Sequence, residues 1–399
     1  MPPACDSEVS PEKLLLVSCA RTRLTPETRE RIRALLREPL DWQYLLDAAT
    51  EHSLRPLLLR YIVAVSPNVA PAEWLANLQE SVRANSIRNL FFTAELCKIL
   101  DRFSECGISA IPYKGPVLAA QAYGDVALRE FDDLDVIVSQ RDIHAAHQAI
   151  TSLGYAAKFP WIHSPEIRES FVPGEYSYVD CGRRVAVELH TEYTLRHFPK
   201  PPDLDSLRRR LTPVSLGGSR VQTFQPEDLL PILCVHGSKD FWARISWIAD
   251  ISELVQTSEG FDWQAAMDRA ASLGVERMTH LGMVLALDLL NLSVPEEVLR
   301  QVNADRSANH LAQQLKHRIL APGLLPLSAP WRFLYRIRTA DGYSRGLPYA
   351  VRLLFAPAED DREAIRLPGV LRRFYPALRP FRLLRKYGAG GTASRKPVS

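Results

Sequence analysis

Residues 129–138, which read Arg-Glu-Phe-Asp-Asp-Leu-Asp-Val-Ile-Val, decide how the middle of this chain folds. The apolar run 136–138 predicts a buried strand, because β-branched side chains pack well on a pleated surface. If the strand begins at Asp133, alternation places Asp133 and Asp135 on one face and the apolar side chains on the other. Two residues of strand span roughly 6.6 Å, so both carboxylates can converge on one cation.

Two further stretches predict strands beside this one. Residues 108–113 alternate between apolar and other side chains and are followed by Lys114-Gly115. Residues 184–190 also alternate, so that Glu188 and His190 share a face. Acids on neighbouring strands with a lysine close by predict a site for a metal ion and a phosphate group.

The three acids need a compensating cation if they meet. An Asp-x-Asp pair alone is weak evidence for a metal site, because acids are also common in turns and solvated loops. Carboxylates about 4 Å apart repel by roughly 4 kcal/mol at an effective dielectric constant near 20. A sheet face with Asp133, Asp135 and Glu188 is therefore unfavourable without cations. Mg²⁺ held by carboxylates and substrate phosphates is the usual solution, and two ions about 3.5–4 Å apart would hold the attacking and leaving oxygens.

The composition is typical of a soluble globular protein. The chain has 399 residues, of which 46% are hydrophobic and 24% charged, and this length favours two or three domains. Its formal net charge of +3 is too small to imply a nucleic-acid partner by itself. The six cysteines form no C-x-x-C pair, which argues against a zinc ribbon and fits a reducing compartment. No stretch reads as a membrane span or a signal peptide, so we expect a cytoplasmic protein.

The hydrophobic period divides the chain into four predicted regions. Residues 1–105 are expected to be helical, with helix starts at Ser10-Pro11 and Thr25-Pro26 and helices over 26–38, 41–50 and 71–105. Residues 106–205 predict a small mixed sheet in the order β-α-β-α-β-β, with helices on one side. It includes a helix from Ser139 to Leu153 and a hairpin turn at 180–182.

The rest of the chain is expected to return to helix. Residues 206–320 predict a helical domain, with helices over 226–237 and 241–254, from Asp262 onward, and through the apolar run 281–290. Residues 321–399 form an extension rich in proline and arginine, and its end, 388–399, is expected to be disordered. The segment 371–386 mixes arginines with aromatic residues. This composition predicts either a segment that binds an anionic partner, which would be RNA or a membrane surface, or an amphipathic helix that packs on the protein.

The order of the motifs resembles a known superfamily. Residues 111–138 contain Ile-Pro-Tyr-Lys-Gly, then Arg129, then Asp-Leu-Asp-Val-Ile-Val, and are similar to the core motif of polymerase-β-type nucleotidyltransferases. More narrowly, they resemble the bacterial family called uncharacterised nucleotidyltransferases, whose last element, acid-apolar-histidine, is matched by residues 188–190. The resemblance covers roughly residues 40–300, and 371–386 resembles the family's usual ending. Weaker similarities lie at Asp41-Trp42, Arg88-Asn89-Leu90, His236, Trp247, Asp250 and Asp262-Trp263.

The resemblance implies an α+β fold in which a small mixed-sheet nucleotidyltransferase core lies between N-terminal and C-terminal helical regions. It also implies metal-assisted transfer of a nucleoside monophosphate from an NTP to an acceptor, with release of pyrophosphate. Asp133 and Asp135 would hold two Mg²⁺ ions, with Mn²⁺ as an alternative. Glu188 would complete the metal site and help to deprotonate the acceptor.

The resemblance also assigns the residues that contact the nucleotide. Lys114 and Gly115 would cradle the triphosphate, since glycine allows close backbone approach and lysine offers a point charge. Arg129 would contact a phosphate or brace the Asp-x-Asp loop, with a structural ion pair as the alternative. The acceptor is left open among a small molecule, a peptide, a protein and RNA.

Two departures from the superfamily pattern support a second hypothesis. Pro116 stands where serine usually follows the glycine, and it has neither a hydroxyl nor an N–H to offer a phosphate. Glu188 stands where aspartate is more usual. These departures indicate an altered acceptor or an inactive site. The alternative is therefore a catalytically inactive protein of the same fold that binds nucleotide or RNA as a scaffold or regulator.

The remaining alternatives fit the sequence less well. In haloacid-dehalogenase-type phosphatases and many glycosyltransferases the apolar strand precedes the Asp-x-Asp pair, whereas here it follows. That order favours nucleotidyl transfer and leaves sugar or phosphoryl transfer as a third hypothesis. A lone histidine such as His190 is more often structural than a ligand. We expect His236 and Asp250 to make a polar contact inside the C-terminal helical domain.

Overall fold

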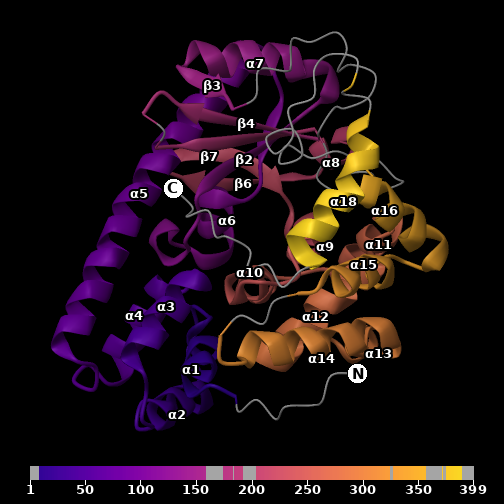
Figure 1. Cartoon of the computed structure of the whole chain (residues 1–399). Helices are drawn as coiled ribbons and strands as arrows, with labels where there is room; N and C mark the ends of the chain where they lie inside the picture. Colours follow the sequence, from indigo (N-terminus) through magenta and orange to yellow (C-terminus); the bar gives the residue numbers. More distant parts are fainter. Residues whose placement is uncertain are drawn as a thin grey trace.

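The computed structural model describes residues 9–158, 174–182, 184–191, 204–323, 327–355, 371 and 374–388. Within them, helices surround one five-stranded mixed sheet, which confirms the predicted α+β class (Figure 1). None of the helices in this part of the chain has the length and apolar character that a membrane crossing needs. The predicted disorder after residue 388 lies outside the described residues.

Five helices form the N-terminal part of the protein. They are α1 (Pro11–Cys19), α2 (Pro26–Leu35), α3 (Trp42–Glu51), α4 (Arg55–Val65) and α5 (Ala72–Glu105). The Ser10 and Thr25 side chains accept hydrogen bonds from backbone N–H groups in the first turns of α1 and α2, which confirms the predicted helix starts. The long helix α5 runs from the other N-terminal helices to the sheet (Figure 1).

The sheet has the strand order β1-β2-β5-β4-β3, and only the β2–β5 pair is parallel. Its strands are β1 (Ala110–Pro112), β2 (Asp133–Val138), β3 (Tyr155–Ala157), β4 (Glu175–Asp180) and β5 (Ala186–His190). Between β1 and β2 lie α6 (Gly115–Leu118), a π-helical turn (Ala119–Tyr123) and a 3-10 turn (Val126–Leu128). A second 3-10 turn (Gln140–Asp142) and α7 (Ile143–Ser152) follow β2.

The predicted strands and the hairpin are confirmed, with two differences. Strands β1 and β5 are shorter than the predicted 108–113 and 184–190, and β3 was not predicted at all. A strand of three residues is too short to show alternation in sequence, and β3 forms because β4 offers it an open edge to pair with. The helix expected from Ser139 begins as a 3-10 turn before α7.

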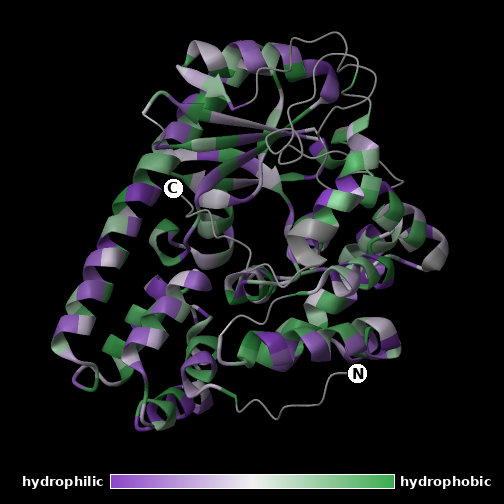
Figure 2. Cartoon of the chain, in the orientation of Figure 1, coloured by the Kyte–Doolittle hydropathy of each residue, from purple (hydrophilic) through white to green (hydrophobic). Residues whose placement is uncertain are grey.

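One face of the sheet is covered by α5 and α7. The inward side chains of β2 and β5, such as Leu134, Val136 and Leu189, are completely buried there. They belong to the same apolar cluster as Phe92 and Phe103 on α5. In Figure 2, α5 carries both green and purple turns, as expected of a helix with one face on the core. The polar side chains of the same strands must therefore point to the other face.

The C-terminal half begins with a small helix and a hairpin. Its elements are α8 (Leu204–Arg208), β6 (Leu211–Leu216), β7 (Ser219–Phe224), α9 (Pro226–Lys239), α10 (Ile245–Thr257), α11 (Trp263–Leu273), α12 (Glu276–Leu290), α13 (Glu296–Ala304), α14 (Arg306–Leu320), α15 (Ala329–Arg338), α16 (Tyr343–Phe355) and α18 (Tyr375–Gly388). The helix α18 packs against α15 and α16, and Arg379 Nε donates to the Leu353 carbonyl at 3.1 Å. This confirms the predicted amphipathic helix on the protein; its binding to an anionic partner stays a prediction.

The expectation of continuous helix after residue 205 is wrong for 211–224, which form the antiparallel β6–β7 hairpin. Gly217 and Gly218 both have positive φ, at 57° and 85°, as a tight two-residue hairpin turn requires. Val214, Leu216 and Val221 supply the alternating apolar pattern. The pair of glycines was therefore an available signal for this hairpin.

The helix predicted over 241–254 begins four residues later because Trp242 is buried in the core. Phe241 and Trp242 have positive φ, which is incompatible with a right-handed helix, so they separate α9 from α10. The Trp242 side chain is completely buried. A Cβ at Gly237 would lie 2.5 Å from the indole ring, and a Cβ at Gly282 would lie 2.8 Å from it. Two glycines thus make the space that the indole ring fills.

The N-terminal and C-terminal helices share one core beneath the sheet. The largest apolar cluster joins Leu15 and Leu58 with Ile111 of β1 and with Leu285 and Leu311 of the C-terminal helices. The buried His52 lies at this junction: its Nδ1 accepts the backbone N–H of Ile245, and its Nε2 lies 2.5 Å from Lys13 Nζ.

His52 should make the protein less stable in mild acid. Burial, followed by the charge of Lys13, lowers the pKa of His52 to about 3. Unfolded histidine has a pKa of about 6.5, so protons bind the unfolded chain more readily. The stabilisation is complete above pH 6.5 and is lost as the pH falls toward 3, with about 2 kcal/mol lost at pH 5.

Urea unfolding at pH 7 and pH 5, compared between the wild type and His52→Gln, measures this contribution. The wild type should lose about 2 kcal/mol more than the variant between the two pH values. Equal losses in both proteins would contradict a buried neutral histidine.

Candidate functional site

The parallel pairing of β2 with β5 brings the predicted acids together. In this register Asp135 lies opposite Glu188, and His190 lies opposite Ile137. Since side chains alternate along a strand, Asp133, Asp135, Glu188 and His190 all belong to the face of the sheet away from α5 and α7. The sequence predicted this shared face, which the register confirms.

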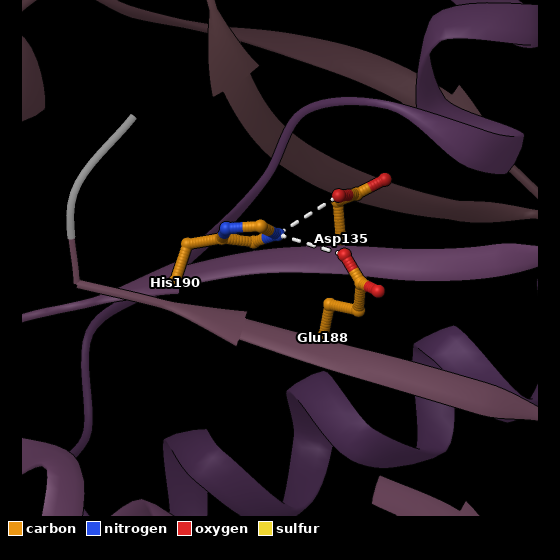
Figure 3. Close-up of side chains that lie close together, drawn as sticks. All are labelled: Asp135, Glu188 and His190. Carbon is orange, nitrogen blue, oxygen red and sulfur yellow. Dashed lines mark hydrogen bonds and ion pairs between the residues drawn. The ribbon is translucent and has the colours of Figure 1, made fainter. Parts of the chain in front are cut away.

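Three of these side chains form a compact group. One carboxylate oxygen each of Asp135 and Glu188 and one ring nitrogen of His190 lie within 4.8 Å of one another. The three side chains point toward a common centre (Figure 3). His190 Nε2 is 2.9 Å from Asp135 Oδ1 and 3.6 Å from Glu188 Oε2. The other Asp135 oxygen, Oδ2, is buried and has no hydrogen-bond partner among the described residues. A buried carboxylate oxygen without a donor is suited to bind a cation.

Lys114 faces this group from the end of β1. Its Nζ lies 2.7 Å from Asp135 Oδ1, and the two side chains are only 12% and 1% exposed. Burial alone would lower the pKa of Lys114, but the carboxylates of Asp135 and Asp133 outweigh it and hold that pKa well above its usual value. Although burial opposes ionisation of Asp135 as well, Lys114 and the hydrogen bond from His190 hold the pKa of Asp135 far below its usual range.

One lysine does not neutralise the remaining acids. Burial and then the charge of Asp135 raise the pKa of Asp133, whose carboxylate lies outside the compact group. Burial, followed by the charges of Glu175 and Asp135, raises the pKa of Glu188. Without a cation, burial and mutual repulsion therefore favour the protonated forms of Asp133 and Glu188, and a bound cation would favour their ionised forms.

Glu175 is a fourth acid at the site that the sequence analysis missed. It lies opposite His190 in the antiparallel β4–β5 pair, and its Oε2 is 3.4 Å from Lys239 Nζ at the end of α9. Burial would raise the pKa of Glu175, but Lys239, His190 and Lys114 together lower it. Ser177 lies opposite Glu188, and Glu175, two residues earlier on β4, lies on the same face. Extending the predicted strand over 176–179 by one residue toward its start would have found Glu175.

Gly115 allows the lysine-bearing turn to approach β2. Its φ is +53°, and a Cβ there would lie 3.1 Å from the backbone oxygen of Asp133. A side chain would therefore strain the backbone and press against the Asp-x-Asp strand. Pro116 follows in the first turn of α6, so its missing N–H costs the helix nothing but offers nothing to a phosphate.

Of the roles predicted for Arg129, the structure shows the ion pair, which also braces the loop before β2. Its Nε and Nη2 donate to the two carboxylate oxygens of Asp250 at 2.7 Å and 2.9 Å, and Tyr123 donates to the same carboxylate at 2.8 Å. The expected contact of Asp250 inside the C-terminal helical domain is therefore wrong, because Asp250 on α10 holds the loop before β2. His236 instead packs edge-on against Trp247, with ring centroids 5.1 Å apart.

Helix α5 and the start of α4 brace the same loop. Arg88 donates to the side chain of Asp132 and to the Phe131 carbonyl, both at 2.7 Å. Asn89, which is fully buried, donates to the Val126 and Arg129 carbonyls at 2.7 Å. Glu130 pairs with Arg55 at the start of α4. The Asp-x-Asp strand therefore begins from a loop whose backbone is fixed on several sides.

Comparison with known proteins places the chain in the nucleotidyltransferase class. A model of the family described as uncharacterised nucleotidyltransferase matches residues 38–291, so the chain belongs to that family and the resemblance seen in the sequence is confirmed. Among solved structures, the chain is similar to the antibiotic-resistance factor ANT(2'')-Ia, with 14% identity and a TM-score of 0.31. That similarity covers 45% of this chain and 90% of the other. No curated protein matches the chain.

The Arg129–Asp250 pair should be essential for stability. Asp250→Ala leaves the buried Arg129 guanidinium without its carboxylate, so the free energy of unfolding should fall by about 3–5 kcal/mol. Replacing both partners by apolar residues, Arg129→Met with Asp250→Leu, should cost less than Asp250→Ala alone.

Urea unfolding of the purified variants measures both effects. The matched control is Asp288→Ala, which removes the carboxylate of a partly exposed pair with Lys316 and should change stability by less than about 1 kcal/mol. If Asp250→Ala were as mild as this control, the pair would not hold the loop.

Proposed function

We propose that this protein transfers a nucleoside monophosphate from an NTP to an acceptor and releases pyrophosphate, with Mg²⁺ as the metal. The observation that carries the proposal is the compact group of Asp135, Glu188 and His190 opposite Lys114. Membership of the nucleotidyltransferase family supports the reaction type. The acceptor is one of the four classes considered above: a small molecule, a peptide, a protein or RNA.

The metal site in this proposal consists of Asp133, Asp135 and Glu188, for two Mg²⁺ or Mn²⁺ ions. The donor set fits, because hard cations prefer carboxylate oxygens and Asp135 Oδ2 lacks a partner among the described residues. When bound, the metal neutralises charge on the phosphates and favours deprotonation of the attacking group. His190, through its hydrogen bond, orients Asp135.

The remaining residues act on the substrates. Lys114 places a positive charge beside the aspartates, where the triphosphate of a bound NTP would lie, and Gly115 lets the backbone come close to it. The Glu188 side chain is 26% exposed, compared with 1% for Asp135, so an acceptor could reach Glu188 but not Asp135. Glu188 is therefore the residue we assign to help remove the acceptor's proton.

The alternative is an inactive nucleotide- or RNA-binding scaffold of the same fold. Pro116 favours it, since this loop residue cannot donate a hydrogen bond to a phosphate. A scaffold would bind NTP without releasing pyrophosphate. The two experiments below separate the two functions.

Asp133→Asn should abolish transfer while leaving the protein folded. Its carboxylate is disfavoured by burial and by Asp135, so removing the charge should not lower stability. Asp135→Asn should also abolish transfer, but it should lower stability as well because Lys114 loses its partner. The rate of transfer should fall at least about a hundredfold in both variants.

The measurement incubates the protein with each α-labelled NTP, Mg²⁺ or Mn²⁺ and a cell extract, and follows the labelled product. Asp132→Asn is the matched control, since this neighbouring carboxylate is 45% exposed and pairs with Arg88. It should retain activity within about threefold, a barrier change below 1 kcal/mol. Full activity in Asp133→Asn would rule out the proposed mechanism.

Lys114→Gln should weaken NTP binding about tenfold or more, since a hydrogen bond to a charged group contributes about 1.5–3 kcal/mol. Titration of labelled NTP with and without Mg²⁺ gives the Kd, and pyrophosphate release is followed in the same samples. Lys98→Gln, on an exposed lysine of α5, should bind like the wild type. An unchanged Kd in Lys114→Gln would contradict the phosphate role, and binding without pyrophosphate release would favour the scaffold.

A further inference from the structure

The C-terminal helices carry a concentration of exposed apolar side chains. Among the described residues, Leu334, Leu347, Val351, Phe355, Leu371, Phe374 and Phe381 are between 40% and 72% exposed. Single exposed apolar residues are normal on any protein surface. Five of these seven lie on α15, α16 and α18, which pack together, and they indicate an interaction surface.

Helix α16 presents its apolar stripe outward. Leu347, Val351 and Phe355 recur every four residues and so line one side of the helix. On the other side, Tyr349 is buried, and a Cβ at Gly346 would lie 2.3 Å from a backbone oxygen of α15. The helix thus packs through Gly346 and Tyr349 and leaves the α16 stripe, residues 347, 351 and 355, uncovered by the rest of the described chain. An ordinary surface helix does the reverse and buries its apolar stripe.

Arginines border the α16 stripe. Arg345 and Arg352 are both exposed, and because they are seven residues apart they lie along the same flank of the helix. Phe381 on the neighbouring α18 is 72% exposed and is followed by Arg382, Arg385 and Lys386 in the sequence. Exposed arginines therefore lie beside the exposed apolar side chains of α16.

The charge of the chain is unevenly distributed. After residue 326 there are fifteen arginines and lysines and five acids, although the formal charge of the whole chain is only +3. Residues 1–326 therefore carry a net charge of −7, and the C-terminal part carries +10. Such an asymmetry favours an anionic partner for the C-terminal helices alone.

We propose that the α16 stripe, together with Phe374 and Phe381, is a docking surface for an anionic lipid bilayer. Aliphatic side chains such as Leu347 and Val351 cannot stack on nucleic-acid bases, but they can enter the boundary between headgroups and acyl chains. The arginines beside them would contact anionic headgroups, at about 1 kcal/mol each. The protein binds the surface of the membrane without crossing it.

Flotation of the full-length protein with vesicles tests the proposal without any assay of catalysis. Vesicles of phosphatidylcholine alone are compared with vesicles that also contain phosphatidylglycerol, each at 0.1 M and 0.5 M NaCl. Binding to the anionic vesicles should be at least about tenfold tighter and should weaken at the higher salt, because exposed charges are screened.

Variants then test the residues. Leu347→Ser should reduce partitioning into anionic vesicles about tenfold, whereas Leu90→Ser, on an equally accessible leucine of α5 that is 61% exposed, should have no effect. Arg352→Gln should reduce partitioning about fivefold, and Arg31→Gln on α2 serves as its control. Since these side chains are exposed, urea unfolding should be unchanged in all four variants.

Three results would overturn the proposal. The first is equal binding to neutral and anionic vesicles, or binding to neither. The second is wild-type binding by Leu347→Ser. The third is that Leu347→Ser leaves vesicle binding unaffected but abolishes binding to single-stranded RNA or abolishes a concentration-dependent dimer. The surface would then bind RNA in the first case and a second copy of the chain in the second.

Discussion

Negative charge on one largely buried face of a small sheet is the constraint on which the rest of this structure depends. Asp133, Asp135 and Glu188 share that face because β2 and β5 pair in parallel, with Asp135 opposite Glu188. Carboxylates this close repel strongly where the dielectric constant is low. Lys114 compensates part of the charge at 2.7 Å from Asp135. Carboxylate oxygens gathered in this way suit a divalent cation, as the proposed function requires.

The site also depends on helices that are distant in sequence. Asn89 on α5, before this loop in the sequence, and Asp250 on α10, far after it, both hold the loop before β2. Both are buried, so each polar contact is expensive to leave unmade. The family match, over residues 38–291, includes both of these residues. The helical regions keep the Asp-x-Asp strand in register with β5.

The acidic face of the sheet and the C-terminal helices differ in their charge. The sheet gathers acids on one face, whereas the C-terminal part holds a surplus of arginine beside exposed apolar side chains. The two are linked through Arg336 on α15, which donates to the backbone oxygen of Lys239, the residue that pairs with Glu175. A membrane bound by the C-terminal helices would therefore lie against helices that also contact Lys239, the partner of Glu175.

The sequence by itself determined the α+β class, the helix caps at Ser10 and Thr25, the β4–β5 hairpin and the shared face of the acids, because these follow from local periodicity and cap chemistry. Tertiary structure alone decided which partner each polar group found. Arg129 could serve a phosphate or an ion pair until α10 placed Asp250 within 2.7 Å of it. Likewise, Phe241 and Trp242 left the helical pattern because Gly237 and Gly282 opened a pocket for the indole. Packing between distant segments outweighs local propensity, and no pattern within one segment records it.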